Sequence, residues 1–372
     1  MSKMTLAECA ARIWRTRLAI GVLGIASLAA CDDEPTTAPA TATGSSATAQ
    51  RVKSEPRDVS PHREGHVTTK SATLHFLDWG GKGPTLVLLP GLGDNAHIYD
   101  DLAPKLSEYH VIAITRRGYG QSSRPTTGYE VDTLVNDVIA VLDHLHLDRV
   151  YLAGHSIAGN ELTRLSVRYP ERVERVVYLD AAADRSADFS ARSSAAVVLE
   201  DVMNEPPPSA ADLESFGTFV SYQKRISSGP WTPARTNNLW HAVIVDRNDG
   251  HVVSLSTSDA IAETMFMKSL QYHAEFSSLK MPAHAIGALP GTIFDQMPWL
   301  SPTVSGDSLM YAEFFLGAVR AQIQFNLAAF AAQAPFATTQ FIDNTNHYLF
   351  VANESDIIAA LRGFLPSTLS RR

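Results

Sequence analysis

The sequence has very few cysteines. Its 372 residues include two, Cys9 and Cys31, and both lie near the N-terminus. The rest of the chain therefore cannot build a disulfide framework, a cysteine-rich metal site or a cysteine nucleophile. Nothing else in the sequence indicates a metal or cofactor site, so we expect a protein that works with neither.

Positive charge is also scarce. Lys and Arg number 31 against 39 Asp and Glu, which gives a formal net charge of −8. Because nucleic-acid binding needs clustered Lys and Arg for phosphate contacts, a nucleic-acid partner is not expected. Charged residues make up 19% of the chain and apolar residues 45%, a composition that favours a large folded core over general disorder.

The longest N-terminal apolar run is too short to cross a bilayer. Residues 18–30 are mostly apolar and follow Arg12, Arg15 and Arg17, whereas a spanning helix needs about 20 apolar residues. A basic segment followed by a short apolar run is typical of a secretory signal peptide. The run ends in Leu-Ala-Ala-Cys at residues 28–31, which resembles the bacterial lipoprotein signal. The alternative is an ordinary secretory signal with an incidental cysteine.

The lipoprotein resemblance implies a signal peptide at 1–30 and lipidation of Cys31. We therefore expect a protein of the bacterial cell envelope that contacts a membrane only through its lipid anchor. The inner and outer membranes both stay open. Residues 31–66 are rich in Thr, Ala, Ser and Pro, and such a segment is expected to be a flexible tether because it has little apolar surface to bury.

The remainder of the chain alternates between buried apolar runs and segments of helical periodicity. This order predicts an α/β fold with a mostly parallel central sheet and helices on both faces. The alternation stops at 184–280, which we interpret as a mainly helical cap inserted between core segments 67–183 and 281–372. The predicted strands are 86–90, 110–115, 149–153, 173–180, 283–287 and 338–342, and the predicted helices are 131–147, 157–169, 310–332 and one that starts near Asn353.

Ser156 stands between a predicted strand and a predicted helix, in Gly154-His-Ser-Ile-Ala-Gly159. A nucleophile elbow is a strained strand-to-helix turn that exposes a serine at the edge of a sheet. It needs small residues two before and two after the serine, and Gly154 and Ala158 occupy those positions. The pattern predicts that Ser156 is a nucleophile.

The other groups that acyl transfer requires have candidates as well. Two backbone N–H groups must stabilise the oxyanion, and we assign them to Ile157 and to Leu92 of the glycine-rich turn at 90–94. The general base is assigned to His347, because it lies between the last predicted strand and the last predicted helix. The neighbour of the serine, His155, is expected on the other side of the turn.

These motifs together resemble the α/β-hydrolase superfamily, and more narrowly its capped bacterial members. The resemblance covers about residues 70–366. It implies a serine hydrolase that cleaves a small carboxylic ester or similar acyl bond through a covalent acyl-enzyme. A lactonase, an amidase and a C–C hydrolase use the same groups, and a binding module that kept the fold without catalysis is the alternative from another class. The oligomeric state is not predicted.

The carboxylate that orients His347 is assigned to Asp180. Many relatives carry this acid after the strand that follows the cap, where the first carboxylate here is Asp295. Other relatives carry it at the end of the strand after the nucleophile helix, and Asp180 ends that strand. Asp295 and Asp184 stay open as alternatives, while Asp343 is too close to His347 along the chain.

Overall fold

The computed structural model describes residues 60–186 and 205–368. The predicted signal peptide at 1–30, Cys31, and the tether as far as residue 59 lie outside the described residues. Within the described ranges, no helix combines the length and the apolar composition that a membrane crossing requires.

In this part of the chain, one sheet of eight strands has the order β1-β2-β4-β3-β5-β6-β9-β10. β1 and β2 pair antiparallel, as do β2 and β4, and the other neighbours are parallel. The α/β fold and the mostly parallel sheet predicted from the sequence are therefore confirmed. The strands are β1 (Arg63–Thr68), β2 (Thr73–Gly80), β3 (Thr85–Leu89), β4 (His110–Ile114), β5 (Val150–His155), β6 (Val173–Leu179), β9 (Ala283–Leu289) and β10 (Ala337–Asp343).

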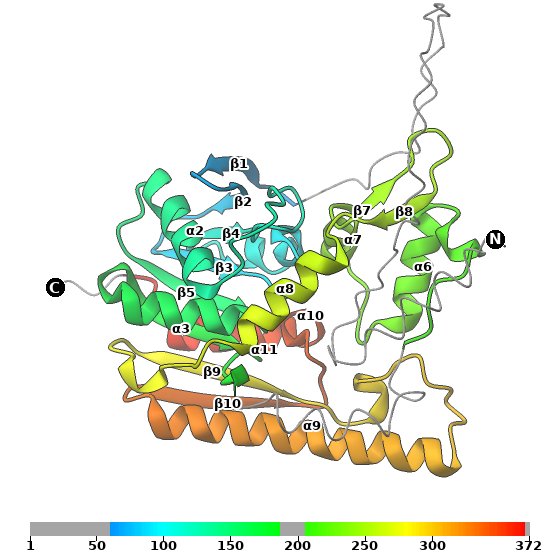
Figure 1. Ribbon diagram of the computed structural model, residues 1–372. Helices are drawn as coiled ribbons and strands as arrows, with labels where there is room; N and C mark the ends of the chain where they lie inside the picture. The colour runs from blue at the N-terminus through cyan, green and yellow to red at the C-terminus, as the bar shows by residue number, and fades with distance from the viewer. Residues whose placement is uncertain (1–59, 187–204, 369–372) are drawn as a thin grey trace, which may run out of the picture.

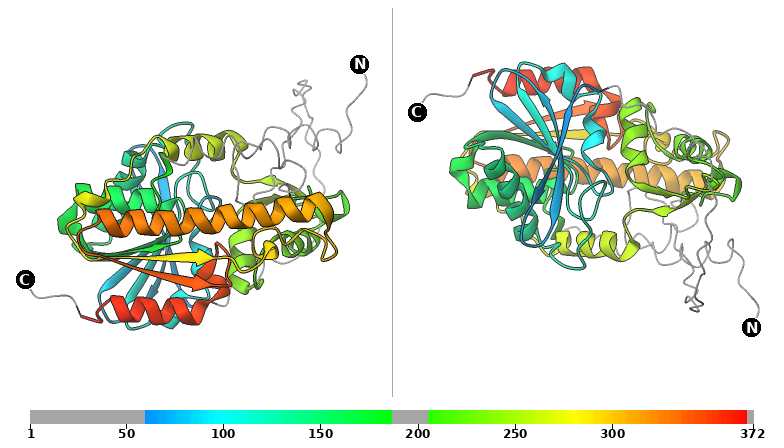
Figure 2. Two further views of the ribbon diagram at one scale, coloured as in Figure 1. Left: turned by 90° about the horizontal axis from the view of Figure 1, so that it is seen from below. Right: turned by 90° about the horizontal axis from the view of Figure 1, so that it is seen from above.

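Helices cover both faces of this sheet, with α9 and α11 on opposite sides (Figure 2). Successive side chains of a strand point to opposite faces of the sheet, so one strand can pack against helices on both sides. Val87 and Leu89 of β3 pack with α2, α3 and α9, whereas Leu86 and Leu88 pack with η2 and α11. The helices of the core are η2 (Ala96–Tyr99), α2 (Val131–His144), α3 (Ala158–Arg168), α9 (Gly306–Gln333), α10 (Leu349–Ala352) and α11 (Glu354–Phe364).

Between β6 and β9 the chain builds a separate cluster beside the sheet (Figure 1). Its described residues include three α-helices, in agreement with the mainly helical cap expected from the sequence, and also a two-stranded antiparallel sheet that is not predicted. Its elements are α6 (Phe216–Ile226), α7 (Pro233–Trp240), β7 (Val243–Val245), β8 (Val252–Leu255) and α8 (Asp259–Leu270). Trp299, from the segment after β9, packs on the same apolar cluster, so the second core segment at 281–372 also contributes to the cap.

The predicted tether boundary at residue 66 is wrong. β1 begins at Arg63, and Ser60 already accepts a hydrogen bond of 2.6 Å from the Trp79 indole. β1 is an edge strand in which Val67 is the one buried residue. A strand at a sheet edge needs few apolar side chains, which is why the apolar pattern of this segment is too weak to reveal it.

Candidate active site

The backbone at Ser156 has the geometry that the elbow pattern predicts. Its φ is 56°, a left-handed conformation that costs a residue with a side chain about 1–2 kcal/mol. The Ser156 N–H donates to the Leu179 carbonyl at the end of β6, at 3.2 Å. A Cβ added at Gly159 would lie 1.9 Å from the Ala181 carbonyl oxygen. The turn is therefore held by close contact between the start of α3 and the end of β6.

Asp180 and His347 meet at this edge of the sheet. Asp180 follows β6 directly, and its Oδ2 lies 2.6 Å from His347 Nδ1. The other carboxylate oxygen, Oδ1, accepts the Ala288 N–H of β9 at 3.1 Å. The Asp180 backbone is also left-handed, with φ 48°, and its N–H donates to the Ile286 carbonyl at 2.8 Å. Two strands therefore fix the carboxylate in one orientation against the imidazole.

The two other acids considered in the sequence have partners of their own. Asp295 accepts hydrogen bonds from the backbone N–H groups of Gly291 and Thr292, at 2.9 and 2.8 Å, and so closes its own turn. Asp184 lies 2.6 Å from His273 Nδ1. Neither of these contacts involves His347, so Asp180 is the one of the three that the fold brings to the imidazole.

His155 has a contact that the sequence analysis missed. Its Nε2 donates to the backbone carbonyl of His347 at 2.9 Å, and the two rings lie 4.4 Å apart. Burial, followed by the charge of His347, holds the pKa of His155 well below its ordinary value, so the ring is neutral. On its other side, a Cβ added at Gly91 would lie 2.7 Å from His155 Nδ1. The neutral ring thus separates the turn at 90–94 from the His347 loop.

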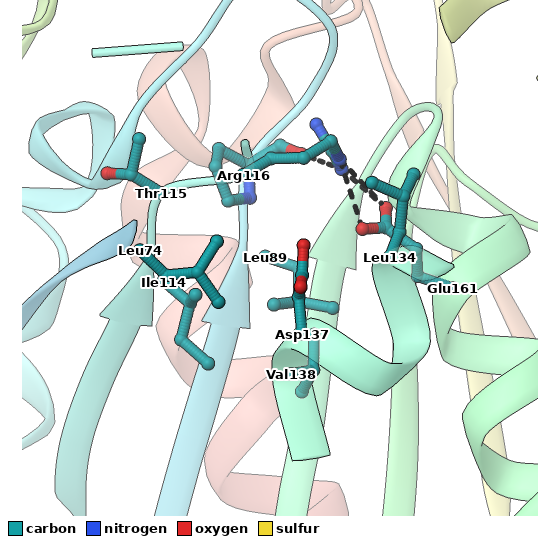
Figure 3. Close-up of a pocket in the computed structure, with 10 residues that line it drawn as sticks. Leu74, Leu89, Ile114, Thr115, Arg116, Leu134, Asp137, Val138 and Glu161 are labelled. Carbon is teal, nitrogen blue, oxygen red and sulfur yellow. Dashed lines mark hydrogen bonds and ion pairs between the residues drawn. The ribbon is translucent and has the colours of Figure 1, made fainter. Parts of the chain in front are cut away.

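A buried ion pair holds the turn that contains Leu92. Arg116 Nε donates to Glu161 Oε1 at 3.0 Å, and its Nη1 and Nη2 donate to the carbonyls of Gly91 and Pro90, at 3.2 and 3.0 Å. Figure 3 shows the Arg116–Glu161 pair at the rim of a small pocket beside α2. Because Arg116 binds both carbonyls, it fixes the orientation of the peptides around Leu92. No role for Arg116 follows from the sequence alone.

The two amides assigned to the oxyanion are free to donate. Within the part of the chain that the structure describes, neither the Leu92 N–H nor the Ile157 N–H donates to another residue. Their side chains share an apolar cluster with Met265 and Phe266 of α8, so the cap covers this end of the site. The Ser156 hydroxyl forms no hydrogen bond with His347 among the described residues. Hydrogen bonds between catalytic groups are often long or poorly aligned when no substrate is bound.

Residues 60–186 and 205–368 contain no group of three His, Cys, Asp or Glu side chains arranged to hold a metal ion. The strained turn at Ser156, the Asp180–His347 contact and the two free amides lie together at the carboxyl ends of the parallel strands.

A family model described as "alpha/beta hydrolase fold" matches residues 84–234. The crystal structure of E-2-(acetamidomethylene)succinate hydrolase superposes with a TM-score of 0.58 at 19% identity, covering 82% of this chain and 99% of that one. The chain has the α/β-hydrolase fold. The carboxylesterase CesB of Bacillus subtilis is similar as well, with a TM-score of 0.54, 17% identity, and coverage of 82% of this chain and 92% of that one.

Curated proteins with similar sequences match about a third of this chain or less. The 3-oxoadipate enol-lactonase 2 of Acinetobacter baylyi is 32% identical over 124 residues, which are 33% of this chain and 46% of the lactonase. The 2-(acetamidomethylene)succinate hydrolase of Mesorhizobium japonicum is 31% identical over 101 residues, 27% of this chain and 36% of that enzyme. The chain thus spans less than half the length of these relatives.

Proposed function

We propose that this protein is a serine hydrolase that cleaves a carboxylic ester or similar acyl bond. The observation that carries the proposal is the 2.6 Å contact between Asp180 and His347, beside a serine in a left-handed strand-to-helix turn. A carboxylate on Nδ1 keeps the proton there and leaves Nε2 free to act as a base. Similarity to hydrolases that include a lactonase and a carboxylesterase supports the same class of reaction.

The reaction proceeds in two acyl transfers. Ser156 Oγ attacks the carbonyl carbon while His347 Nε2 accepts its proton, and the Leu92 and Ile157 N–H groups stabilise the oxyanion. His347 then gives the proton to the leaving alcohol as the carbon–oxygen bond breaks. A water molecule repeats the sequence on the acyl-serine, which releases the carboxylic acid and restores Ser156.

The test is labelling of the protein with a fluorophosphonate, followed by assays with a panel of esters, lactones and amides. Wild-type protein should label at Ser156 and hydrolyse activated esters, whereas Ser156→Ala should lose both. Removal of a serine nucleophile costs about 10⁶-fold in kcat. Activity of Ser156→Ala within tenfold of wild type would refute the assignment. A protein that neither labels nor hydrolyses any member of the panel would be a binding module.

We also propose that Cys31 carries a lipid that attaches the protein to a membrane of a bacterial cell envelope. The proposal rests on the sequence at 28–31 after a basic and apolar segment. Detergent partitioning of the full-length protein, expressed in a bacterial host, should place wild type in the detergent phase and Cys31→Ser in the aqueous phase. Equal partitioning of the two proteins would contradict it.

A further inference from the structure

Three arginines among the described residues are more than nine-tenths buried. The exposed fractions are 5% for Arg116, 1% for Arg117 and 6% for Arg235. Arg116 pairs with Glu161, and Arg117 donates to both oxygens of Asp137, at 2.6 and 2.7 Å. In the described part of the chain, the Arg235 guanidinium forms no ion pair and donates no hydrogen bond, and its Nη1 is buried without a partner.

An unpaired buried guanidinium is unusual because desolvation of the charge costs several kcal/mol. Arginine inside a protein ordinarily donates to a carboxylate, as Arg116 and Arg117 do here. Buried polar groups without partners require an explanation, and a role in binding an ion or ligand is one of the few available. The N–H groups of Arg235 are therefore able to donate to a carboxylate. No carboxylate of the described residues accepts from them.

Arg235 lies on α7 of the cap, close to the candidate active site. Its Cζ is 5.0 Å from the centre of the Tyr348 ring, and the Tyr348 ring is 6.0 Å from that of His347. The guanidinium carbon is thus no farther than about 11 Å from the His347 ring, the sum of the two distances. Arg235 therefore lies within reach of the acyl chain or leaving group of a substrate bound at Ser156.

Asp94 is a carboxylate whose charge acts on Arg235, but both of its oxygens bind other groups. Asp94 Oδ1 accepts from Asn238 at 2.9 Å, and Oδ2 accepts from the Tyr348 hydroxyl at 3.2 Å. No ion pair joins Asp94 to Arg235 within the described residues. Burial also raises the pKa of Asp94 to about 6, so its negative charge is lost as the pH falls through that value. Stacking on the Tyr348 ring stabilises the cation, but it leaves the N–H donors unused.

We propose that Arg235 binds a carboxylate of the substrate, so that this hydrolase prefers esters that carry a second, ionised carboxyl group. The proposal rests on the proposed function at Ser156. The planar guanidinium presents parallel N–H donors that match the two oxygens of a carboxylate. Arg235 is a specificity-determining residue in this scheme, because it contacts a part of the substrate that does not react.

The test compares kcat/KM for matched anionic and neutral esters. One pair places the charge in the acyl part: mono-p-nitrophenyl glutarate against its methyl ester. The other places it in the leaving group: para-acetoxybenzoate against its methyl ester. Wild type should favour the anionic member of one pair. In Arg235→Gln the ratio of anionic to neutral kcat/KM should fall about 10- to 100-fold, the range expected for loss of a charged hydrogen bond.

Two controls make the result specific. Arg235→Lys keeps the positive charge but lacks the parallel N–H donors, and it should retain part of the preference for anionic esters. Arg225→Gln removes another cap arginine, which is exposed and pairs with Asp212, and should leave the ratio as in wild type. Wild type with no preference in either pair, or an Arg235→Gln ratio equal to that of wild type, would overturn the proposal.

A binding measurement separates this proposal from the proposed function. Calorimetric titration of Ser156→Ala with glutarate should give binding that the additional change Arg235→Gln removes and Arg225→Gln does not. If fluorophosphonate fails to label wild type, the hydrolase proposal fails while this titration still decides the carboxylate site. If esters are hydrolysed but glutarate binding does not depend on Arg235, the carboxylate site is refuted and the hydrolase stands.

Discussion

Replacement of Asp180 by asparagine is the most direct perturbation of the candidate active site. The backbone N–H of Ala288 donates to Asp180 Oδ1 at 3.1 Å. In the variant this N–H needs an acceptor, so the amide oxygen must occupy the Oδ1 position. The amide NH₂ is then directed at His347 Nδ1, where the carboxylate oxygen lies at 2.6 Å in the native protein.

This orientation selects the wrong tautomer of the histidine. An NH₂ group can only donate, so Nδ1 must be unprotonated and the proton moves to Nε2. The imidazole can then no longer accept the proton of Ser156. The same exchange in an Asp–His–Ser site costs about 10⁴-fold in kcat, which corresponds to about 5.5 kcal/mol of transition-state stabilisation at about 1.36 kcal/mol per tenfold change.

The assay is steady-state hydrolysis of a p-nitrophenyl ester, with thermal denaturation to check folding. We expect kcat of Asp180→Asn to fall by about four orders of magnitude. KM should change little, because Asp180 does not reach the substrate. The melting temperature should stay near that of wild type, since the Ala288 hydrogen bond is kept.

Asp295→Asn is the matched control. That carboxylate accepts only from the backbone and hydroxyl of its own turn, so its loss should lower stability slightly and leave kcat within a few-fold of wild type. Near-normal kcat in Asp180→Asn together with a large loss in Asp295→Asn would refute the reasoning, although Ser156 and His347 would still stand.

Three further predictions concern stability, each measured as the free energy of unfolding. Gly159→Ala should destabilise the protein by about 1–3 kcal/mol, because its Cβ would lie 1.9 Å from the Ala181 carbonyl; unchanged stability would contradict the tight elbow. Glu161→Gln should cost about 3–5 kcal/mol by leaving the buried Arg116 charge unpaired, and an exposed control, Glu354→Gln, should cost far less. Burial lowers the pKa of His75 to about 2, so its contribution to stability is present above pH 6.5 and is lost as the pH falls below that value. The loss is about 1.4 kcal/mol per pH unit, and His75→Asn should reduce the slope between pH 6.5 and 4.5.

The strands of the sheet centre could be predicted from the sequence because both of their faces are buried. The apolar runs at 86–90 and 149–153 correspond to β3 (Thr85–Leu89) and β5 (Val150–His155). β1 could not be found in the same way, since five of its six residues are not buried. β7 and β8 are also short and half-exposed. An apolar pattern therefore reveals the buried strands of the sheet. It misses the more exposed strands, which are held mainly by backbone hydrogen bonds.

Some residues of the candidate site could likewise be identified from local sequence, and others could not. Ser156 could be identified because the elbow is a local turn with a local steric requirement. Asp180 could be proposed because the end of a strand indicates an edge of the sheet. Arg116 and His155 could not, since their contacts with Gly91 and His347 join residues far apart in the chain. Only the folded structure shows that Arg116 binds the carbonyls that orient the Leu92 amide, the proposed oxyanion donor.

The cap and the oxyanion turn form one hydrogen-bonded unit through a single residue of α7. Asn238 Oδ1 accepts the Asn95 N–H at 2.8 Å, its carbonyl accepts from the Asn95 side chain at 2.8 Å, and its Nδ2 donates to Asp94 at 2.9 Å. Asp94 is the last residue of the turn that holds Leu92, and Asn95 follows it directly. Because α7 also carries Arg235, movement of this helix would displace the proposed carboxylate site and the oxyanion donor together. The part of the cap proposed to select a substrate is therefore the part that holds the turn proposed to stabilise the transition state.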